Sequence, residues 1–158
     1  MNKIIIYFSY TGHTREIANK IKEKLNCDIL ELEPVIPYSK DYNKVVEEEQ
    51  NNSSNNKTIS IKDLEVDLSN YDEIILGSPV WWYTITPVIR TFLKENDLSN
   101  KTIYPFATNA GWLGHTSQEI TKLCPNSKVM ELMNILYSEE GDTLKTDPKL
   151  INNWINTL

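Results

Sequence analysis

Hydroxyl groups are concentrated in one short segment near the start of the chain, which follows the apolar run Ile4–Phe8 and precedes a helical pattern. At the start of a helix, unpaired backbone N–H groups and the positive end of the helix dipole attract an anion. The segment has neither the Gly-x-x-x-x-Gly-Lys nor the Gly-x-Gly-x-x-Gly pattern, so the predicted ligand group is a small terminal phosphate monoester. The alternative is that a hydroxyl only caps the helix. The candidate residues are Ser9, Tyr10, Thr11, Gly12, His13 and Thr14.

Three consecutive aromatic residues form the second candidate segment, which follows another apolar run. Consecutive side chains in an extended loop point in different directions, so at most one or two of them can pack into a core. A planar, electron-poor ring system would stack on the remainder. A loop folded over the sheet edge, or a protein interface, is the alternative. The candidate residues are Pro79, Val80, Trp81, Trp82 and Tyr83.

A glycine-containing segment after a further apolar run is the third candidate. Its glycines permit close backbone approach to a ligand, and its amides would hydrogen-bond the polar edge of a ring. The candidate residues are Thr108, Asn109, Ala110, Gly111, Trp112 and Gly114. Both histidines of the chain lie in Gly-His-Thr tripeptides, without a triad partner or metal-ligand spacing. No catalytic residue and no metal site are therefore predicted, and a catalytic His13 or His115 is the minor alternative.

The elements that must position these segments alternate between strand and helix. Buried strand patterns at 4–8, 72–77 and 101–107 precede the three segments, and each segment leads toward a helical pattern. This alternation predicts one α/β domain over residues 1–158, a three-layer α/β/α open sheet with five parallel strands. Ligands bind such sheets outside the carboxyl ends of the strands, where the strand order reverses. The three segments are therefore expected to meet at one edge.

Other elements are predicted from weaker patterns and capping residues. The alternating segment 28–32 is expected to be an edge strand, 41–50 a weak helix and the polar tract 51–56 a mobile loop. Residues 128–136 form a fifth strand candidate. Thr86 and Asp147, each followed by proline, are predicted N-caps, and Thr116 with Glu119 has capping-box spacing.

Composition excludes several classes of protein. The chain has 158 residues, of which 16 are Lys or Arg and 22 are Asp or Glu, so its net charge of −6 disfavours nucleic acid as a partner. Its apolar runs are far shorter than the roughly 20 residues of a membrane span, and its first residues lack a signal-peptide pattern. Cys27 and Cys124 have no metal-ligand spacing and are expected to be free thiols. A cytoplasmic location is predicted.

The three segments together resemble the flavodoxin family, in order and over nearly the whole chain. Residues 7–14 look like the flavodoxin phosphate loop, 77–83 like its flavin-stacking loop, and 107–114 lie where its second flavin loop belongs. The resemblance implies the strand order 2-1-3-4-5 and FMN as cofactor. It also implies that 9–14 hold the phosphate, that 79–83 line the isoalloxazine with one Trp or Tyr stacked on it, and that 108–111 face its pyrimidine edge. Trp112 is expected to shield the ring.

The resemblance implies a monomeric, low-potential electron carrier that docks basic redox proteins through its acidic surface. An uncharged phosphate site, acidic surroundings and aromatic stacking should all disfavour a negatively charged reduced flavin. An FMN-dependent oxidoreductase that passes hydride from NAD(P)H to a quinone is the alternative. A phospho-ligand or protein-interaction module that has lost flavin is a third, non-redox candidate.

Overall fold

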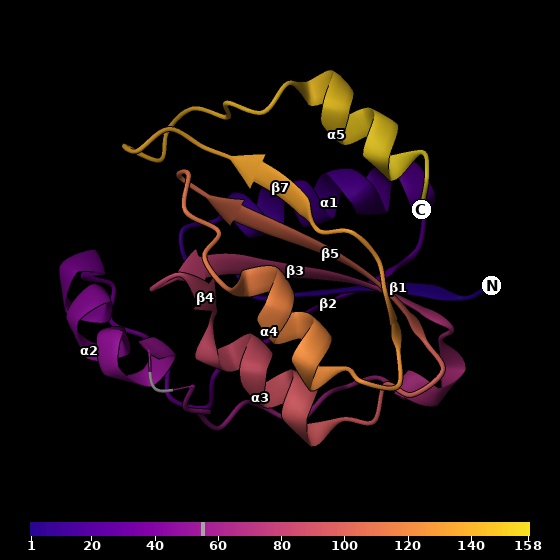
Figure 1. The fold of residues 1–158 in the computed structure, drawn as a ribbon, viewed down its shortest axis with the longest axis horizontal. Helices are drawn as coiled ribbons and strands as arrows, with labels where there is room; N and C mark the ends of the chain where they lie inside the picture. Colours follow the sequence, from indigo (N-terminus) through magenta and orange to yellow (C-terminus); the bar gives the residue numbers. More distant parts are fainter. Residues whose placement is uncertain (55) are drawn as a thin grey trace.

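A parallel sheet between two layers of helices makes up the computed structural model, which describes residues 1–54 and 56–158 (Figure 1). The described strands are β1 (Lys3–Tyr7), β2 (Asp28–Glu31), β3 (Glu73–Trp81), β4 (Thr84–Ile85), β5 (Thr102–Asn109), β6 (Lys128–Val129) and β7 (Met133–Leu136). The described helices are α1 (His13–Leu25), α2 (Tyr42–Ser54), α3 (Pro87–Glu95), α4 (Thr116–Leu123) and α5 (Pro148–Ile155), with a 3-10 turn, η1 (Leu68–Asn70). None of these helices has the length and apolar composition of a membrane span.

The strand order is β2-β1-β3-β5-β6, and every neighbouring pair in this path is parallel. β7 continues beyond β6 and also pairs parallel with β5, so the predicted fifth strand is present as two short pieces. Counting these pieces as one strand, the structure confirms the order 2-1-3-4-5. It also confirms that β2 lies at an edge.

The core has two parts, one on each face of the sheet. Along β1, Ile4 and Ile6 point to one face while Ile5 and Tyr7 point to the other, as successive strand residues must. The first face packs against α3 and α4, and the second against α1 and α5 (Figure 1). Because both faces are covered, β1 is a continuous apolar run rather than an alternating one.

Two predicted boundaries were wrong. β3 does not end at Gly77 but continues to Trp81, where it turns into β4 as an antiparallel hairpin. The aromatic segment expected to be a loop is therefore largely strand and turn. α2 extends to Ser54, so the first four residues of the tract 51–56 are helical, and Asn55 lies outside the described residues.

The helix caps were predicted correctly at two of three positions. Thr86 accepts a hydrogen bond from the Ile89 N–H at 3.5 Å, and Asp147 accepts one from the Lys149 N–H at 2.9 Å. The capping box at α4 was wrong, because the Thr116 hydroxyl donates to the Leu113 carbonyl at 2.6 Å. The Glu119 carboxylate, which was predicted to complete the capping box, instead pairs with a buried arginine.

That arginine, Arg90, is fully buried and connects four segments. Its Nε donates to Glu119 Oε1 at 2.9 Å, its Nη1 to the Lys57 carbonyl at 3.0 Å and its Nη2 to the Ile85 carbonyl at 3.4 Å. Arg90 therefore ties α3 to α4, to β4 and to the segment after α2. A buried guanidinium is tolerated here because a carboxylate and two carbonyls replace its water.

Replacing Glu119 with alanine should leave the Arg90 charge buried without its counterion. We expect the free energy of unfolding to fall by about 3 kcal/mol, as for other broken buried ion pairs. Urea denaturation followed by circular dichroism measures the change. Glu95→Ala, at an exposed position of α3, is the control. Equal effects of the two substitutions would contradict a stabilising role for the pair.

Candidate functional site

The carboxyl ends of β1, β3 and β5 bring the three candidate segments together at one edge of the sheet. The buried hydroxyls of Thr14 and Thr108 are 2.8 Å apart and join the first segment to the third. The rings of Tyr10 and Trp81 meet edge to face, with centroids 5.9 Å apart, and join the first to the second. The His115 N–H donates to the Tyr83 carbonyl at 2.6 Å and joins the second segment to the start of α4.

The first segment presents backbone N–H groups at the start of α1. Gly12 is the N-cap residue, with a φ of 101°, and the cap has no side-chain hydrogen bond. The Ser9 hydroxyl accepts hydrogen bonds from the N–H groups of Gly12 and Arg15, at 3.2 and 3.3 Å. Helix capping therefore accounts for the hydroxyl of Ser9 but not for those of Thr11 and Thr14. The Arg15 guanidinium lies beside Gly12 and is paired with Glu31 on β2, at 2.7 Å. Thr11 is exposed at the tip of the loop.

His13 is held by the segment that follows β7. Its imidazole stacks on the ring of Tyr137 with centroids 4.0 Å apart and an interplanar angle of 11°. Its Nε2 hydrogen-bonds the Gly141 carbonyl, and its Nδ1 lies 3.3 Å from the Thr11 hydroxyl oxygen. Burial, together with the negative charge of Glu16, raises the pKa of Tyr137 above its usual value. His13 is thus fixed on three sides.

The hairpin of β3 and β4 points its three aromatic side chains in different directions, as predicted. Trp81 packs inward against Phe8 and Tyr38, Trp82 donates its indole N–H to the Val46 carbonyl at 3.1 Å, and Tyr83 is 55% exposed. Trp82 and Tyr83 form the two-residue turn, with φ values of 49° and 64°. Such turns favour Asn and Gly, and each aromatic residue in this conformation costs about 1–2 kcal/mol. Backbone strain of this kind is concentrated at functional sites.

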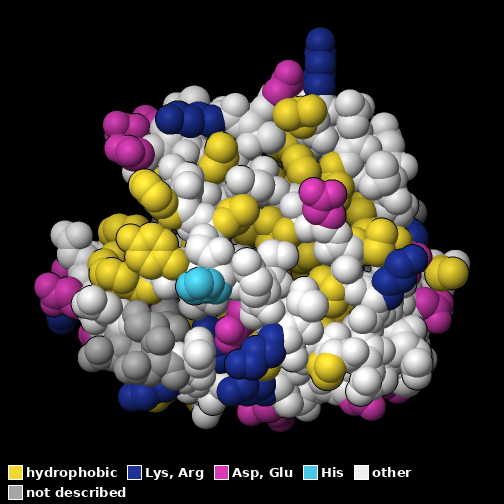
Figure 2. All heavy atoms as spheres, viewed as in Figure 1, with side chains coloured by type: hydrophobic (Ala, Val, Ile, Leu, Met, Phe, Trp, Pro, Cys, Tyr) yellow, Lys and Arg dark blue, Asp and Glu magenta, His cyan; other side chains and the backbone are white. Residues whose placement is uncertain are grey.

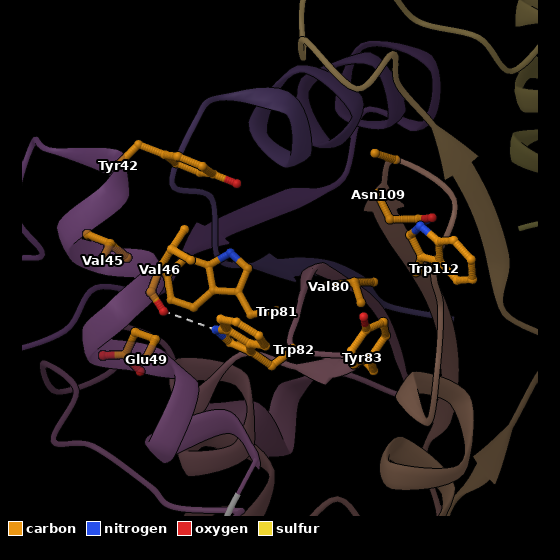
Figure 3. A pocket seen from close by; sticks show the side chains of 11 residues that line it. Tyr42, Val45, Val46, Glu49, Val80, Trp81, Trp82, Tyr83, Asn109 and Trp112 are labelled. Carbon is orange, nitrogen blue, oxygen red and sulfur yellow. Dashed lines mark hydrogen bonds between the residues drawn. The ribbon is translucent and has the colours of Figure 1, made fainter.

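A cavity of about 280 Å³ lies between α2, the hairpin and the end of β5 (Figure 3). Trp81 and Trp82 face α2 across the cavity, and Trp112 lies on the side of β5. Its walls are mainly apolar, and ligand sites are typically apolar with few polar groups. The lining residues are Tyr42, Val45, Val46, Glu49, Val80, Trp81, Trp82, Tyr83, Asn109, Ala110 and Trp112.

The contribution of α2 to this cavity was missed by the sequence reasoning. Tyr42, Val45, Val46 and Glu49 follow the i, i+3, i+4, i+7 spacing of one helix face, which was the available signal. Glu49 is buried, and its negative charge adds to burial in raising the pKa of Tyr38. The cavity therefore has a carboxylate on its α2 side.

The third segment is ordered by Asn109. Its side-chain oxygen accepts from the Gly111 N–H at 2.9 Å, and its amide nitrogen donates to Asn134 Oδ1 at 2.7 Å. Ala110 and Asn109 line the cavity, whereas Trp112 is 72% exposed at its rim. Gly114 does not line the cavity. A Cβ on Gly114 would lie 2.2 Å from the Tyr83 carbonyl oxygen. The lack of a side chain at Gly114 therefore lets its backbone lie against the backbone of Tyr83.

A family model for flavodoxins matches residues 2–157 of the chain. Among solved structures, a protein from Bacteroides eggerthii is 26% identical, with a TM-score of 0.81 over 99% of this chain and 96% of that one. A flavoprotein from Lactobacillus acidophilus, solved in complex with FMN, is 23% identical, with a TM-score of 0.75 over 84% and 92%. Oxidised flavodoxin 2 from Bacillus cereus is 19% identical, with a TM-score of 0.59 over 99% and 94%. The comparison with curated proteins gave no match.

Replacing Gly114 with alanine should disturb the hairpin turn. Gly114 and Gly111 both have positive φ values, 54° and 133°, so alanine is strained at either position. A Cβ at Gly111 meets nothing within 4 Å, whereas at Gly114 it meets the Tyr83 backbone. We expect both variants to lose about 1–2 kcal/mol of unfolding free energy to backbone strain, and Gly114→Ala to lose clearly more. Equal losses in urea denaturation would contradict the close contact.

Proposed function

Because the chain belongs to the flavodoxin family, we propose that it binds FMN at the carboxyl edge of the sheet and works in electron transfer. The observation that carries the proposal is that the start of α1, the aromatic hairpin and a polar loop contact one another at one edge of the sheet, where the hairpin and the loop line a cavity. The flavoprotein from Lactobacillus acidophilus, of similar fold, was solved with FMN. Bound FMN would supply the redox chemistry, and the protein would orient and tune it.

The phosphate end of FMN fits the first segment. The start of α1 offers N–H groups that lack partners within the helix, and the loop adds the hydroxyls of Ser9 and Thr11. Thr14, also proposed as a phosphate contact, has its hydroxyl bonded to Thr108. Arg15, the cation beside the loop, is paired with Glu31. The loop would therefore bind phosphate through neutral donors.

The flavin ring fits the cavity. Its apolar walls and the rings of Trp81, Trp82 and Tyr83 suit a planar heterocycle, and Asn109 and Ala110 place polar backbone at one side. Figure 3 shows Trp82 on the hairpin and Trp112 on the side of β5, at two different sides of the cavity. The aromatic walls and the net negative charge of the protein would oppose adding negative charge to a ring in this cavity. This supports a low reduction potential.

A redox partner would dock around the mouth of this cavity. Tyr42, Tyr83 and Trp112 are exposed there, at 58%, 55% and 72%, and form an aromatic rim. Figure 2 shows apolar side chains gathered at this end of the molecule, with acidic side chains near them. With a net charge of −6, the protein would attract a partner whose apolar contact is surrounded by Lys and Arg.

The wall that α2 adds to the cavity favours one second function. This wall makes the space beside the hairpin a mainly apolar cavity, which suits a small planar acceptor near the flavin ring. The chain would then be an FMN-dependent oxidoreductase that takes hydride from NAD(P)H and reduces a quinone-type molecule.

The FMN site is tested by titrating FMN at pH 5.5 into the purified protein and into Thr11→Val, followed by flavin absorbance and fluorescence. Valine is similar in shape but cannot donate to the phosphate, and losing a hydrogen bond to a charged group costs about 1.5–3 kcal/mol, which weakens binding at least tenfold. Thr121→Val, on α4 away from the site, should bind like the parent protein. Failure of the parent protein to take up FMN would refute the proposal.

Anaerobic addition of NADPH to the FMN-loaded protein separates carrier from enzyme. As a carrier, the protein should keep its oxidised flavin spectrum for minutes and lose it only when a separate reductase is added. Rapid bleaching by NADPH alone, followed by reoxidation with a quinone, would favour the enzyme. The same titration with NADH shows whether reduction requires the 2′-phosphate that distinguishes NADPH from NADH.

A further inference from the structure

His13 is held by contacts on three sides of its ring. Its ring stacks on Tyr137, and its Nε2 hydrogen-bonds the carbonyl of Gly141. A Cβ on Gly141 would lie 3.2 Å from His13 Cε1, so the segment after β7 closes over the ring. The remaining ring nitrogen, Nδ1, is 3.3 Å from the exposed hydroxyl of Thr11.

The partners of the ring determine where its protons lie. A carbonyl oxygen only accepts hydrogen bonds, so Nε2 must carry a hydrogen in every charge state of His13. In the neutral ring, Nδ1 then has no hydrogen, and the Thr11 hydroxyl must donate to it. In the imidazolium, Nδ1 carries a hydrogen and donates to the Thr11 oxygen. The direction of this hydrogen bond therefore reverses when His13 is protonated.

We propose that His13 is a positioning residue whose protonation turns the Thr11 hydroxyl toward the phosphate as a donor, so that a proton and the ligand phosphate bind together. The inference rests on the proposed FMN site. With neutral His13, the Thr11 hydrogen is used within the protein and only its oxygen faces the ligand. With the imidazolium, that hydrogen is free for a phosphate oxygen, and the added positive charge attracts the phosphate.

Several charged or titratable groups surround His13. On α1, Glu16 lies one turn further along and acts on Tyr137, while Arg15 is paired with Glu31. On the segment after β7, Tyr137 stacks on the ring, and Asp142 has its pKa lowered by hydrogen bonds from Ser138 and Thr143. Glu139 and Glu140 are exposed in the same segment. Most of these groups are acidic.

The sign of the pH dependence follows from linkage. Imidazole is the side chain that changes charge between about pH 5 and 8. If the protonated form binds phosphate more tightly, the affinity for FMN increases as the pH falls through the titration of His13. By reciprocity, bound FMN must make His13 harder to deprotonate. The ligand phosphate itself takes up a proton near pH 6, which acts in the opposite direction.

The test measures FMN dissociation constants from pH 8.5 to 5.5 for the parent protein, His13→Gln and His115→Gln. His115 is the matched control, because it is the only other histidine, lies in the same Gly-His-Thr tripeptide and is exposed. Dividing by the His13→Gln values removes the titration of the phosphate. Relative to His13→Gln, the parent protein should bind FMN at least fivefold more tightly at pH 5.5 than at pH 8.5. His115→Gln should behave like the parent protein. Riboflavin, which lacks the phosphate, should show no such dependence.

Two further measurements address the hydrogen-bond direction. Imidazole ¹⁵N spectra of the ligand-free protein should show His13 with its hydrogen on Nε2 at high pH, and FMN should shift its titration to higher pH. Thr11→Ser should keep the pH dependence and Thr11→Val should weaken it. The Thr11 hydroxyl would have no such role if neutral His13 carried its hydrogen on Nδ1. The same conclusion would follow if Thr11→Val kept the full pH dependence of FMN binding.

The outcomes separate this inference from the proposed function. If FMN binds and His13→Gln has the same pH dependence as the parent protein, the inference is wrong and the FMN site stands. If the parent protein fails to bind FMN at every pH, the proposed function itself is refuted.

Discussion

Parallel pairing of β1, β3 and β5 is the constraint on which the site depends. Parallel strands place all their carboxyl ends at one edge, and helices on both faces leave that edge free for loops. The candidate segments at residues 9–14, 79–83 and 108–114 meet there although long stretches of chain separate them. The residues at the ends of the three strands differ in chemical type, so hydroxyl groups, aromatic rings and polar backbone groups lie together at this edge.

The segments at this edge hold one another in place. Thr14 and Thr108 share a buried hydrogen bond, and the Tyr83 carbonyl accepts from His115 while Gly114 lies against it. These contacts explain how the strained turn at Trp82 and Tyr83 persists, because its carbonyl and its indole N–H are both bonded to neighbouring elements. Such mutual support keeps the candidate site ordered although Tyr83 and Trp112 are exposed.

Arg90 extends this support away from the site. It bonds the carbonyl at the end of β4, the segment after α2 and a carboxylate on α4. The hairpin and the segment after α2 are thus connected through one buried cation. On the opposite side of the edge, His13 links the start of α1 to the segment after β7. Both residues carry charge or can acquire it, whereas the sheet between them is apolar.

The sequence by itself determined the alternation of strands and helices, the two caps at Thr86 and Asp147, and the three candidate segments at the ends of β1, β3 and β5. These features are local, since periodicity and capping depend on neighbouring residues. Only the tertiary structure decided that Glu119 pairs with Arg90 instead of capping α4, that Gly114 serves the Tyr83 backbone, and that α2 forms a wall of the cavity. Each of these contacts has a partner that is distant in the chain. The free energy of a buried contact depends on which groups meet, and sequence spacing does not show which distant groups will meet.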